Sequence, residues 1–271
     1  MSESPLRRGY RTFRRDGLRW LSVRGLGYAV FGREGCPEPV RWRLGRRYYR
    51  RAMSFDTDEY AAPLDPFEIT YVDPSRITHT TMREYPPWGS KERLFGAVED
   101  GDWDRPDPDA KLPYEFCERP IYQIFHARFE EGKAWAEIDG IQRRLRSVEE
   151  GKSTWRNCTS REDVFRRCAY CDALYESLRA EGCRTQRELG PRDREPGFMP
   201  AMGEEILVDI GRNGELLHVG GMHRLAIAKL LDLSEIPVAV LVRHAEWMAY
   251  RDRVYERGRA SDHPDLESLA R

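Results

Sequence analysis

The sequence predicts a mixed α+β fold, and three stretches of the 271-residue chain carry that prediction. Residues 67–72 are rich in strand-forming side chains and end at Asp73-Pro74, a turn signal. Residues 120–181 place apolar side chains at helical spacing. Residues 205–242 combine a strand, an Asn-Gly turn, a returning strand, a helix and a buried strand. We therefore expect a small sheet with helices packed on it.

The composition limits the class of protein. Charged residues make up 34% of the chain, yet the formal net charge is −1, so the overall basic character of a nucleic-acid-binding protein is absent. No apolar run approaches the length of a membrane span, and no secretory signal is evident. Six cysteines in a chain of this length do not indicate a disulfide framework. We expect a cytoplasmic protein, with peripheral attachment to a membrane as the alternative.

Residues 1–55 predict a basic helical arm. Arginines alternate with apolar and aromatic side chains through residues 5–52, whereas residues 56–109 are acidic. One interpretation is an amphipathic arm that docks on nucleic acid or on an anionic membrane. The other is a solvated helix that covers its own acidic domain. The main domain is expected at 56–247, after a proline-containing linker at 53–66, and a C-terminal helix or tail at 248–271.

Two helical segments are expected within the main domain. Residues from about 115 to 158 form a helical insertion with two apolar stripes. A longer helix begins after Thr159 or Ser160, either of which can cap it, and ends at Gly182. Its expected inner face holds Phe165, Cys168, Cys171, Leu174, Tyr175 and Leu178. The two cysteines form a Cys-x-x-Cys pair without a second pair, which favours core packing over zinc or redox chemistry.

The segment from Glu204 to Trp247 is predicted to hold a phosphate-bearing ligand. Gly220 and Gly221 break the second strand of the hairpin just before a helix, where a ligand can approach the backbone. The start of a helix favours an anion, but His223 and Arg224 place cations there, against the helix dipole. A bound anion explains both cations. The alternative is that Arg224 pairs with an internal carboxylate and His223 belongs to the core.

A resemblance favours the first interpretation. The segment 219–231, Val-Gly-Gly-Met-His-Arg-Leu-Ala-Ile-Ala-Lys-Leu-Leu, followed by Ile236-Pro-Val238, resembles the ParB/sulfiredoxin superfamily, which includes the free-serine kinase. Gly-Asp-Trp-Asp at 101–104 and Arg-His-Ala-Glu-Trp at 243–247 are similar to a microbial set of ParB-like proteins. The resemblance covers residues 160–247, and more loosely the chain back to Phe67.

The resemblance implies a small ParB/sulfiredoxin-like sheet and a nucleotide, either ATP, ADP or CTP, usually bound with magnesium. Its phosphates would lie on the segment Gly220, Gly221, Met222, His223 and Arg224. Two departures matter. Met222 replaces the cysteine of sulfiredoxin, and Gly220 replaces the acidic residue of the serine kinase. No DNA-reading helix-turn-helix domain follows Trp247, which disfavours chromosome partitioning.

Three functions compete. The first is a nucleotide-dependent phosphotransferase or nucleotide hydrolase, in which His223 and Arg224 hold phosphate. A carboxylate from Glu84, Asp102 or Asp104 would hold magnesium or act as base, and Arg243 and His244 would complete the site. The second is a non-catalytic, nucleotide-gated module that binds DNA or anionic membrane through residues 5–52. A ParB-like nuclease ranks last, because the sequence contains no metal-binding cluster of the kind that nucleases use.

Overall fold

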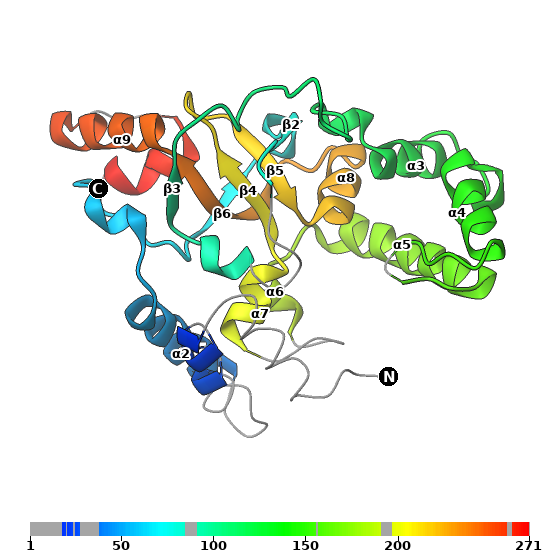
Figure 1. Cartoon of the computed structure of the whole chain (residues 1–271), viewed down its shortest axis with the longest axis horizontal. Helices are drawn as coiled ribbons and strands as arrows, with labels where there is room; N and C mark the ends of the chain where they lie inside the picture. Colours follow the sequence, from blue (N-terminus) through cyan, green and yellow to red (C-terminus); the bar gives the residue numbers. More distant parts are fainter. Residues whose placement is uncertain are drawn as a thin grey trace.

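The computed structural model describes residues 18–19, 21–23, 25–27, 38–84, 91–155, 157–190, 197–258 and 262–270. The described part is α+β, with a mixed six-stranded sheet (Figure 1). Its strands are β1 (Ile69–Val72), β2 (His79–Thr80), β3 (Ala97–Glu99), β4 (Ile206–Ile210), β5 (Leu216–Gly220) and β6 (Ile236–His244). Among the described helices, none is long and apolar enough to cross a membrane.

The sheet is built around β6. The strand order is β1-β6-β4-β5-β2, and β3 pairs with the C-terminal half of β6. Strands β4 and β5 form the predicted antiparallel hairpin, and β4 runs parallel to β6. All nine residues of β6 are buried, which explains its continuous apolar sequence. The predicted strand at 67–72 and the buried strand at 236–242 are both confirmed as β1 and β6.

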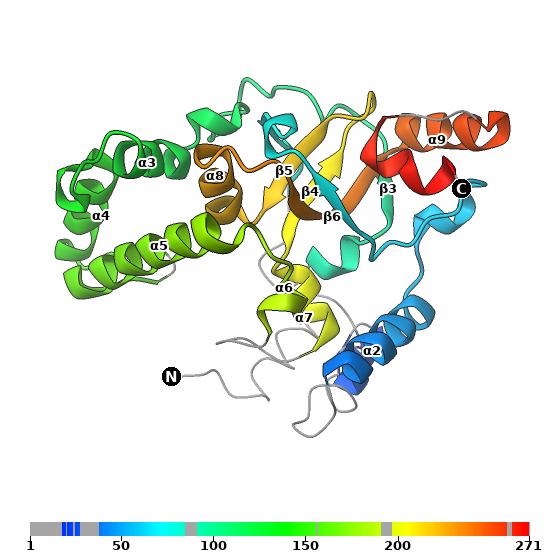
Figure 2. The same cartoon turned by 180° about the vertical axis from the view of Figure 1, so that it is seen from behind.

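One face of the sheet carries α8 and the helical insertion. Helix α8 packs against α3 and α5, and these two extend away from the sheet together with α4 (Figures 1 and 2). Their bounds are α3 (Pro120–Phe129), α4 (Asp139–Glu149), α5 (Arg161–Glu181) and α8 (Met222–Leu230). The expected start and end of α5 are confirmed, because Ser160 and Asp163 form a capping box and Gly182 adopts φ 70°.

The inner stripe of α5 differs at one position from the prediction. Cys168 and Cys171 are buried, and burial raises the pKa of each thiol to about 12, so both side chains pack in the core as expected. Phe165 was expected beside them, but 37% of it is exposed. Val164 occupies the inner position instead, at the i−4 position from Cys168, where side chains lie on the same helix face.

The opposite face of the sheet is covered by α2 (Glu38–Ala52), α7 (Phe198–Gly203) and a cluster of aromatic rings. Tyr49 of α2 is only 4% exposed and stacks on Phe198 of α7, with 6.1 Å between ring centroids. The part of the basic arm at 38–52 therefore packs on its own domain. The rest of the arm lies largely outside the described residues.

The remaining helices lie at the ends of the sheet. Short α6 (Gln186–Leu189) precedes α7, and α9 (Ala245–Arg257) follows β6 at the end of the sheet away from α3–α5 (Figure 1). Strands β2 and β3 were not predicted from the sequence. Each is three residues or shorter and pairs in parallel with a strand more than a hundred residues later in the chain.

Candidate functional site

The start of α8 is shaped by Gly221. This residue is the N-cap and has left-handed dihedral angles, φ 77° and ψ 23°, which glycine adopts without a steric penalty. A Cβ atom there would lie 2.8 Å from the Cα atom of Ile206 in β4, so only glycine fits. The N-cap glycine has no side chain that could cap the first turn of α8. The backbone N–H groups of that turn therefore point toward a place where an anion can bind.

Lys91, from a distant part of the sequence, brings a cation beside Gly220, the residue before the N-cap of α8. It begins the short 3₁₀ helix η3 (Lys91–Leu94), and its Nζ atom donates to the carbonyl oxygen of Val219 at 3.4 Å. A Cβ atom on Gly220 would be 3.5 Å from that Nζ atom. Burial lowers the pKa of Lys91, and Asp209, Glu92 and Glu204 partly oppose that effect. An anion beside Gly220 would favour the charged form of Lys91.

His223, in the first turn of α8, lies between two aromatic rings. The ring of Trp155 is nearly parallel to it, at 11° and 6.1 Å between centroids, and Phe125 meets it edge-on at 5.3 Å. The indole N–H of Trp155 donates to Nε2 of His223 at 3.4 Å, so a neutral His223 carries its proton on Nδ1. Trp155 has φ 31°, an uncommon value for a residue other than glycine and of a kind that concentrates at functional sites.

Two arginines add positive charge around Trp155. The guanidinium groups of Arg144 and Arg167 lie 5.0 and 5.9 Å from the centre of its ring. Burial, and next the neighbouring Arg143, lower the pKa of Arg144. Among the described residues neither Arg144 nor Arg167 forms an ion pair with a carboxylate. These two arginines thus add positive charge beside Trp155, the ring that contacts His223.

Arg224 is used inside the protein. Its guanidinium donates to the carbonyl oxygens of Glu204 and Arg184 and lies 3.6 Å from the carboxylate of Glu205. The alternative in which Arg224 pairs with an internal carboxylate is therefore the observed arrangement, and we leave Arg224 out of the phosphate site. Met222 packs, partly buried, against the core below α8, and Gly220 is the buried last residue of β5.

The structure does not bring Arg243 and His244 to the start of α8. Gly220 pairs with Leu207 at one end of the β4–β5 hairpin, whereas Arg243 pairs with Ile210 at the other end of β4. Three residues of strand separate these levels, which is roughly 10 Å. The expectation that both residues complete one site with Gly220–Arg224 is corrected, because it inferred proximity from nearness in the sequence without the strand register.

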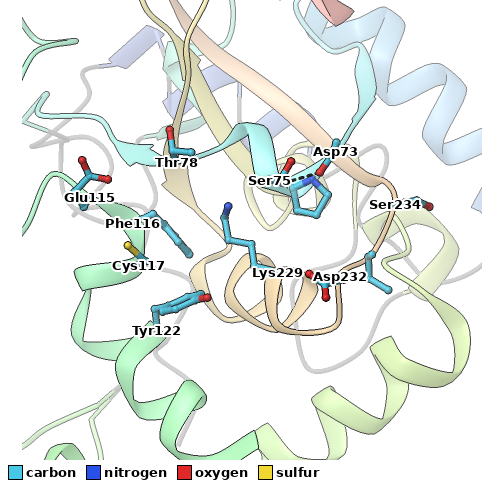
Figure 3. Close-up of a pocket in the computed structure, with 12 residues that line it drawn as sticks. Asp73, Ser75, Thr78, Glu115, Phe116, Cys117, Tyr122, Lys229, Asp232 and Ser234 are labelled. Atoms are coloured by element: carbon cyan, nitrogen blue, oxygen red, sulfur yellow. Dashed lines mark hydrogen bonds between the residues drawn. The ribbon is translucent and has the colours of Figure 1, made fainter. Parts of the chain in front are cut away.

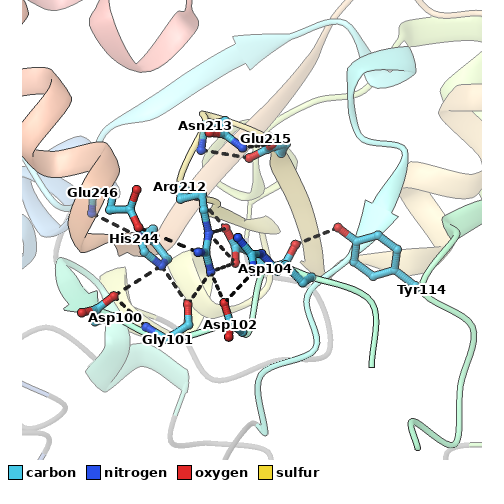
Figure 4. Close-up of polar contacts among 11 residues, drawn as sticks. Asp100, Gly101, Asp102, Asp104, Tyr114, Arg212, Asn213, Glu215, His244 and Glu246 are labelled. Carbon is cyan, nitrogen blue, oxygen red and sulfur yellow. Dashed lines mark hydrogen bonds and ion pairs between the residues drawn. The ribbon is translucent and has the colours of Figure 1, made fainter. Parts of the chain in front are cut away.

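Asp102 and Asp104 also lie at that far end, where they bind Arg212 of the hairpin turn (Figure 4). Asp104 is 8% exposed, and it accepts from the backbone N–H of Arg212 at 2.8 Å and from its Nε at 2.9 Å. Burial alone would raise the pKa of Asp104, but the hydrogen bonds from Arg212 outweigh it and lower the pKa. Both aspartates therefore connect the Gly-Asp-Trp-Asp loop to the hairpin.

His244 connects the same loop to α9. Its Nε2 donates to the carbonyl oxygen of Gly101 at 2.9 Å, and its Nδ1 accepts from the backbone N–H of Glu246 at 3.1 Å (Figure 4). Asp100, His244 and Glu246 place potential ligand atoms within 4.8 Å of one another. Because both ring nitrogens of His244 already have partners, this group is better explained as a helix cap than as a metal site.

Arg243 belongs to a buried cluster around Asp265. The carboxylate of Asp265 accepts from Arg243 at 2.5 Å, from the indole of Trp247 at 2.9 Å and from Arg251 at 3.0 Å. Burial would raise the pKa of Asp265, but the two arginines outweigh it and lower the pKa. The Arg-His-x-x-Trp element thus anchors η6 (Pro264–Ala270) to β6 and α9.

Glu84, the last candidate carboxylate, is exposed. It follows Arg83, whose Nε donates to Glu99 of β3 at 2.8 Å. The Pro-Pro-Trp-Gly element at 86–89 lies outside the described residues. Glu84 is therefore not among the residues that the structure places beside Gly221.

A separate cavity of about 460 Å³ lies at the other end of α8 (Figure 3). Lys229 extends into it, with its Nζ atom 5.9 Å from the centre of the Phe116 ring, and burial lowers the pKa of Lys229. Carboxylates of Asp73, Glu115 and Asp232 are among its lining groups. The nine residues of α8 separate this cavity from Gly221 by about 13 Å. A molecule bound there would not contact phosphate at the helix start.

Sequence reasoning missed Lys91 and Trp155. The signal for Trp155 was weak, because an isolated tryptophan in a loop usually anchors that loop to the core. Lys91 lies 128 residues before Val219, and nothing in the local pattern links them. The glycine pair was the useful signal, since glycine at a strand end permits a left-handed turn and a close approach of chain or ligand.

Comparisons with known proteins do not identify a family for this chain. No protein-family model matches this chain, and searches of curated proteins and of solved structures also found no match. Similarity to the ParB/sulfiredoxin superfamily therefore stays a prediction from the residues at 219–238.

Proposed function

We propose that this chain binds the phosphate groups of a nucleotide at the start of α8. The observation that carries the proposal is a helix start that requires glycine as its N-cap at position 221, with Lys91 and His223 nearby. Backbone N–H groups at a helix start and nearby cations together favour a phosphate. ATP, ADP and CTP, with magnesium, are the nucleotides to test first.

Binding is better supported than chemistry by the positions of the carboxylates. Asp102 and Asp104 are occupied by Arg212 at the far end of the hairpin. A residue that holds magnesium or activates a nucleophile must reach the phosphate within hydrogen-bonding distance, directly or through one water. We therefore place neither aspartate in a catalytic role, and we take nucleotide binding as the primary function.

The test is a thermal-unfolding panel of ATP, ADP and CTP, each with and without magnesium. A nucleotide at about 100 times its Kd should add roughly 2.7 kcal/mol to the free energy of unfolding. Lys91→Met and His223→Ala should each weaken binding at least about tenfold, or ~1.4 kcal/mol. Lys133→Met, on an exposed lysine, is the matched control. Absence of stabilisation by every nucleotide, or wild-type affinity in both site variants, would contradict the proposal.

Phosphoryl transfer or nucleotide hydrolysis is the second candidate, and Glu92 favours it. Glu92 follows Lys91 in η3 and is 8% exposed, and its Oε2 atom has no hydrogen-bond partner among the described residues. One buried carboxylate oxygen without a partner is costly. The carboxylate of Glu92 lies beside Gly203 of α7, and a magnesium ion or an attacking water on a nucleotide that extends past Lys91 would satisfy it. Magnesium would supply charge neutralisation at the phosphates.

Glu92→Gln separates the two candidates. If the protein turns nucleotides over, this variant should still bind them but lose turnover by at least about a hundredfold. Nucleotide binding without measurable phosphate release by the wild-type protein would leave binding as the function. Unchanged turnover in Glu92→Gln would remove Glu92 from the mechanism.

A further inference from the structure

A basic groove lies along α2, on the face of the sheet opposite α8. Helix α2, Asp65 and Arg187 of α6 enclose a cavity of about 490 Å³. Arg43, Arg47 and Arg51 line it at intervals of four residues, so their side chains follow one stripe of the helix over about 12 Å. We propose that this groove binds the phosphate backbone of a nucleic acid.

The charges in the groove are only partly neutralised. Arg46 pairs with Asp65, and Arg50 pairs with Asp58 at 2.6 Å. Within the described chain, the row of Arg43, Arg47 and Arg51 forms no ion pair with a carboxylate. Like charges four residues apart destabilise a helix by about 0.2–0.5 kcal/mol per pair. A polyanion in the groove would remove that repulsion.

The groove is held in shape before any ligand arrives. Trp42 of α2 meets Phe198 edge-on at 5.0 Å, and the guanidinium of Arg187 lies 5.6 Å above the Trp42 ring. Tyr49, one turn before the end of α2, is buried against the same phenylalanine. The arginine row therefore lies on a helix that is already packed against the domain, so binding does not have to order a flexible segment.

The chemistry of the groove selects a nucleic acid over a lipid surface. A helix that docks on a bilayer inserts apolar side chains beside its basic ones. The aromatic ring in this groove, Trp42, is held between Arg187 and Phe198 and cannot enter a bilayer. Arginine binds phosphate in a bidentate manner. A row of cations suits a ligand whose charges repeat along its length, and a nucleic acid strand carries one every ~3.4 Å.

Contacts of this kind position a nucleic acid without reading its sequence, so binding should be general and sensitive to salt. The experiment measures anisotropy of fluorescent single- and double-stranded oligonucleotides against the full chain at several salt concentrations. Wild type is compared with the triple variant Arg43→Gln, Arg47→Gln, Arg51→Gln. The control, Arg143→Gln, Arg146→Gln, Arg253→Gln, removes the same charge from exposed arginines outside the groove.

The groove variant should lose at least tenfold in affinity at low salt. Its slope of log affinity against log salt should fall by about 2 to 3, which corresponds to three lost phosphate contacts. The control should bind nearly as wild type does, and both variants should keep the nucleotide-dependent thermal shift. Wild-type affinity in the groove variant would overturn the proposal. So would binding of wild type to phosphatidylserine vesicles but not to any oligonucleotide.

Discussion

The two ends of the β4–β5 hairpin differ in how completely carboxylates neutralise their arginines. At the turn end, Arg212 is matched to Asp102 and Asp104, and Arg243 is matched to Asp265. At the α8 end, Arg224 is matched to Glu205, but Arg144 and Arg167 lie over Trp155 with no described carboxylate partner. An arginine that is neutralised by a carboxylate of the same chain connects two elements of the fold. An arginine without such a carboxylate is available to an anionic ligand and indicates where that ligand binds.

The largest expected effect lies at the turn end. Asp265→Ala leaves Arg243 and Arg251 buried without their carboxylate, which should cost about 3–5 kcal/mol in the free energy of unfolding. Urea denaturation measures this loss. Asp262→Ala, on a nearby exposed aspartate, is the control and should change stability by less than about 0.5 kcal/mol. A small effect of Asp265→Ala would mean that the cluster does not hold η6 in place.

An intermediate effect is expected at the α8 end. Gly221→Ala forces a residue with a Cβ atom into the left-handed region, at about 1–2 kcal/mol, and adds a contact of 2.8 Å with Ile206. Gly258→Ala is the matched control, because Gly258 is also left-handed, with φ 60° and ψ 32°, but has open space around it. The difference in unfolding free energy between the two variants isolates the contact with Ile206. Equal losses would mean that the chain at Gly221 relaxes freely.

A smaller effect follows from His218, which lies within β5 between the two ends. Burial, with help from Arg119 and Lys91, lowers the pKa of His218 to about 3. The imidazole of His218 is therefore protonated below about pH 6.5 in the unfolded chain but stays neutral in the folded chain down to about pH 3. The free energy of unfolding falls as the pH drops between these two values. At pH 5.5 the loss should be about 1.4 kcal/mol relative to pH 7.5. His218→Gln should remove this part of the pH dependence, and an unchanged acid limb would argue against it.

Local patterns predicted the elements that local interactions determine. The hairpin, α8 and β6 follow from strand and helix periods and from the glycines, and α5 follows from Ser160 and Gly182. The hairpin turn itself differs in detail. Of Asn213 and Gly214, only Gly214 has a positive φ. The backbone N–H of Gly214 donates to the carbonyl oxygen of Gly211, so the loop is not the two-residue turn that Asn-Gly predicts.

The sequence patterns could not predict contacts between distant segments of the chain. The ion pair of Asp104 with Arg212 spans 108 residues, and no spacing rule relates them. His244 was expected near phosphate because it follows the last strand, yet the strand register places it beside Gly101. The same residue types serve a ligand or the fold depending on partners that only the three-dimensional arrangement reveals.

The contrast between the two ends is tested most directly by amide hydrogen exchange with and without saturating ATP and magnesium. We predict slower exchange in peptides covering 219–226 and in those that begin at Lys91. Peptides covering 99–104 and 243–247 should exchange at unchanged rates. Protection confined to those latter peptides, with none at 219–226, would contradict the assignment of phosphate binding to the start of α8.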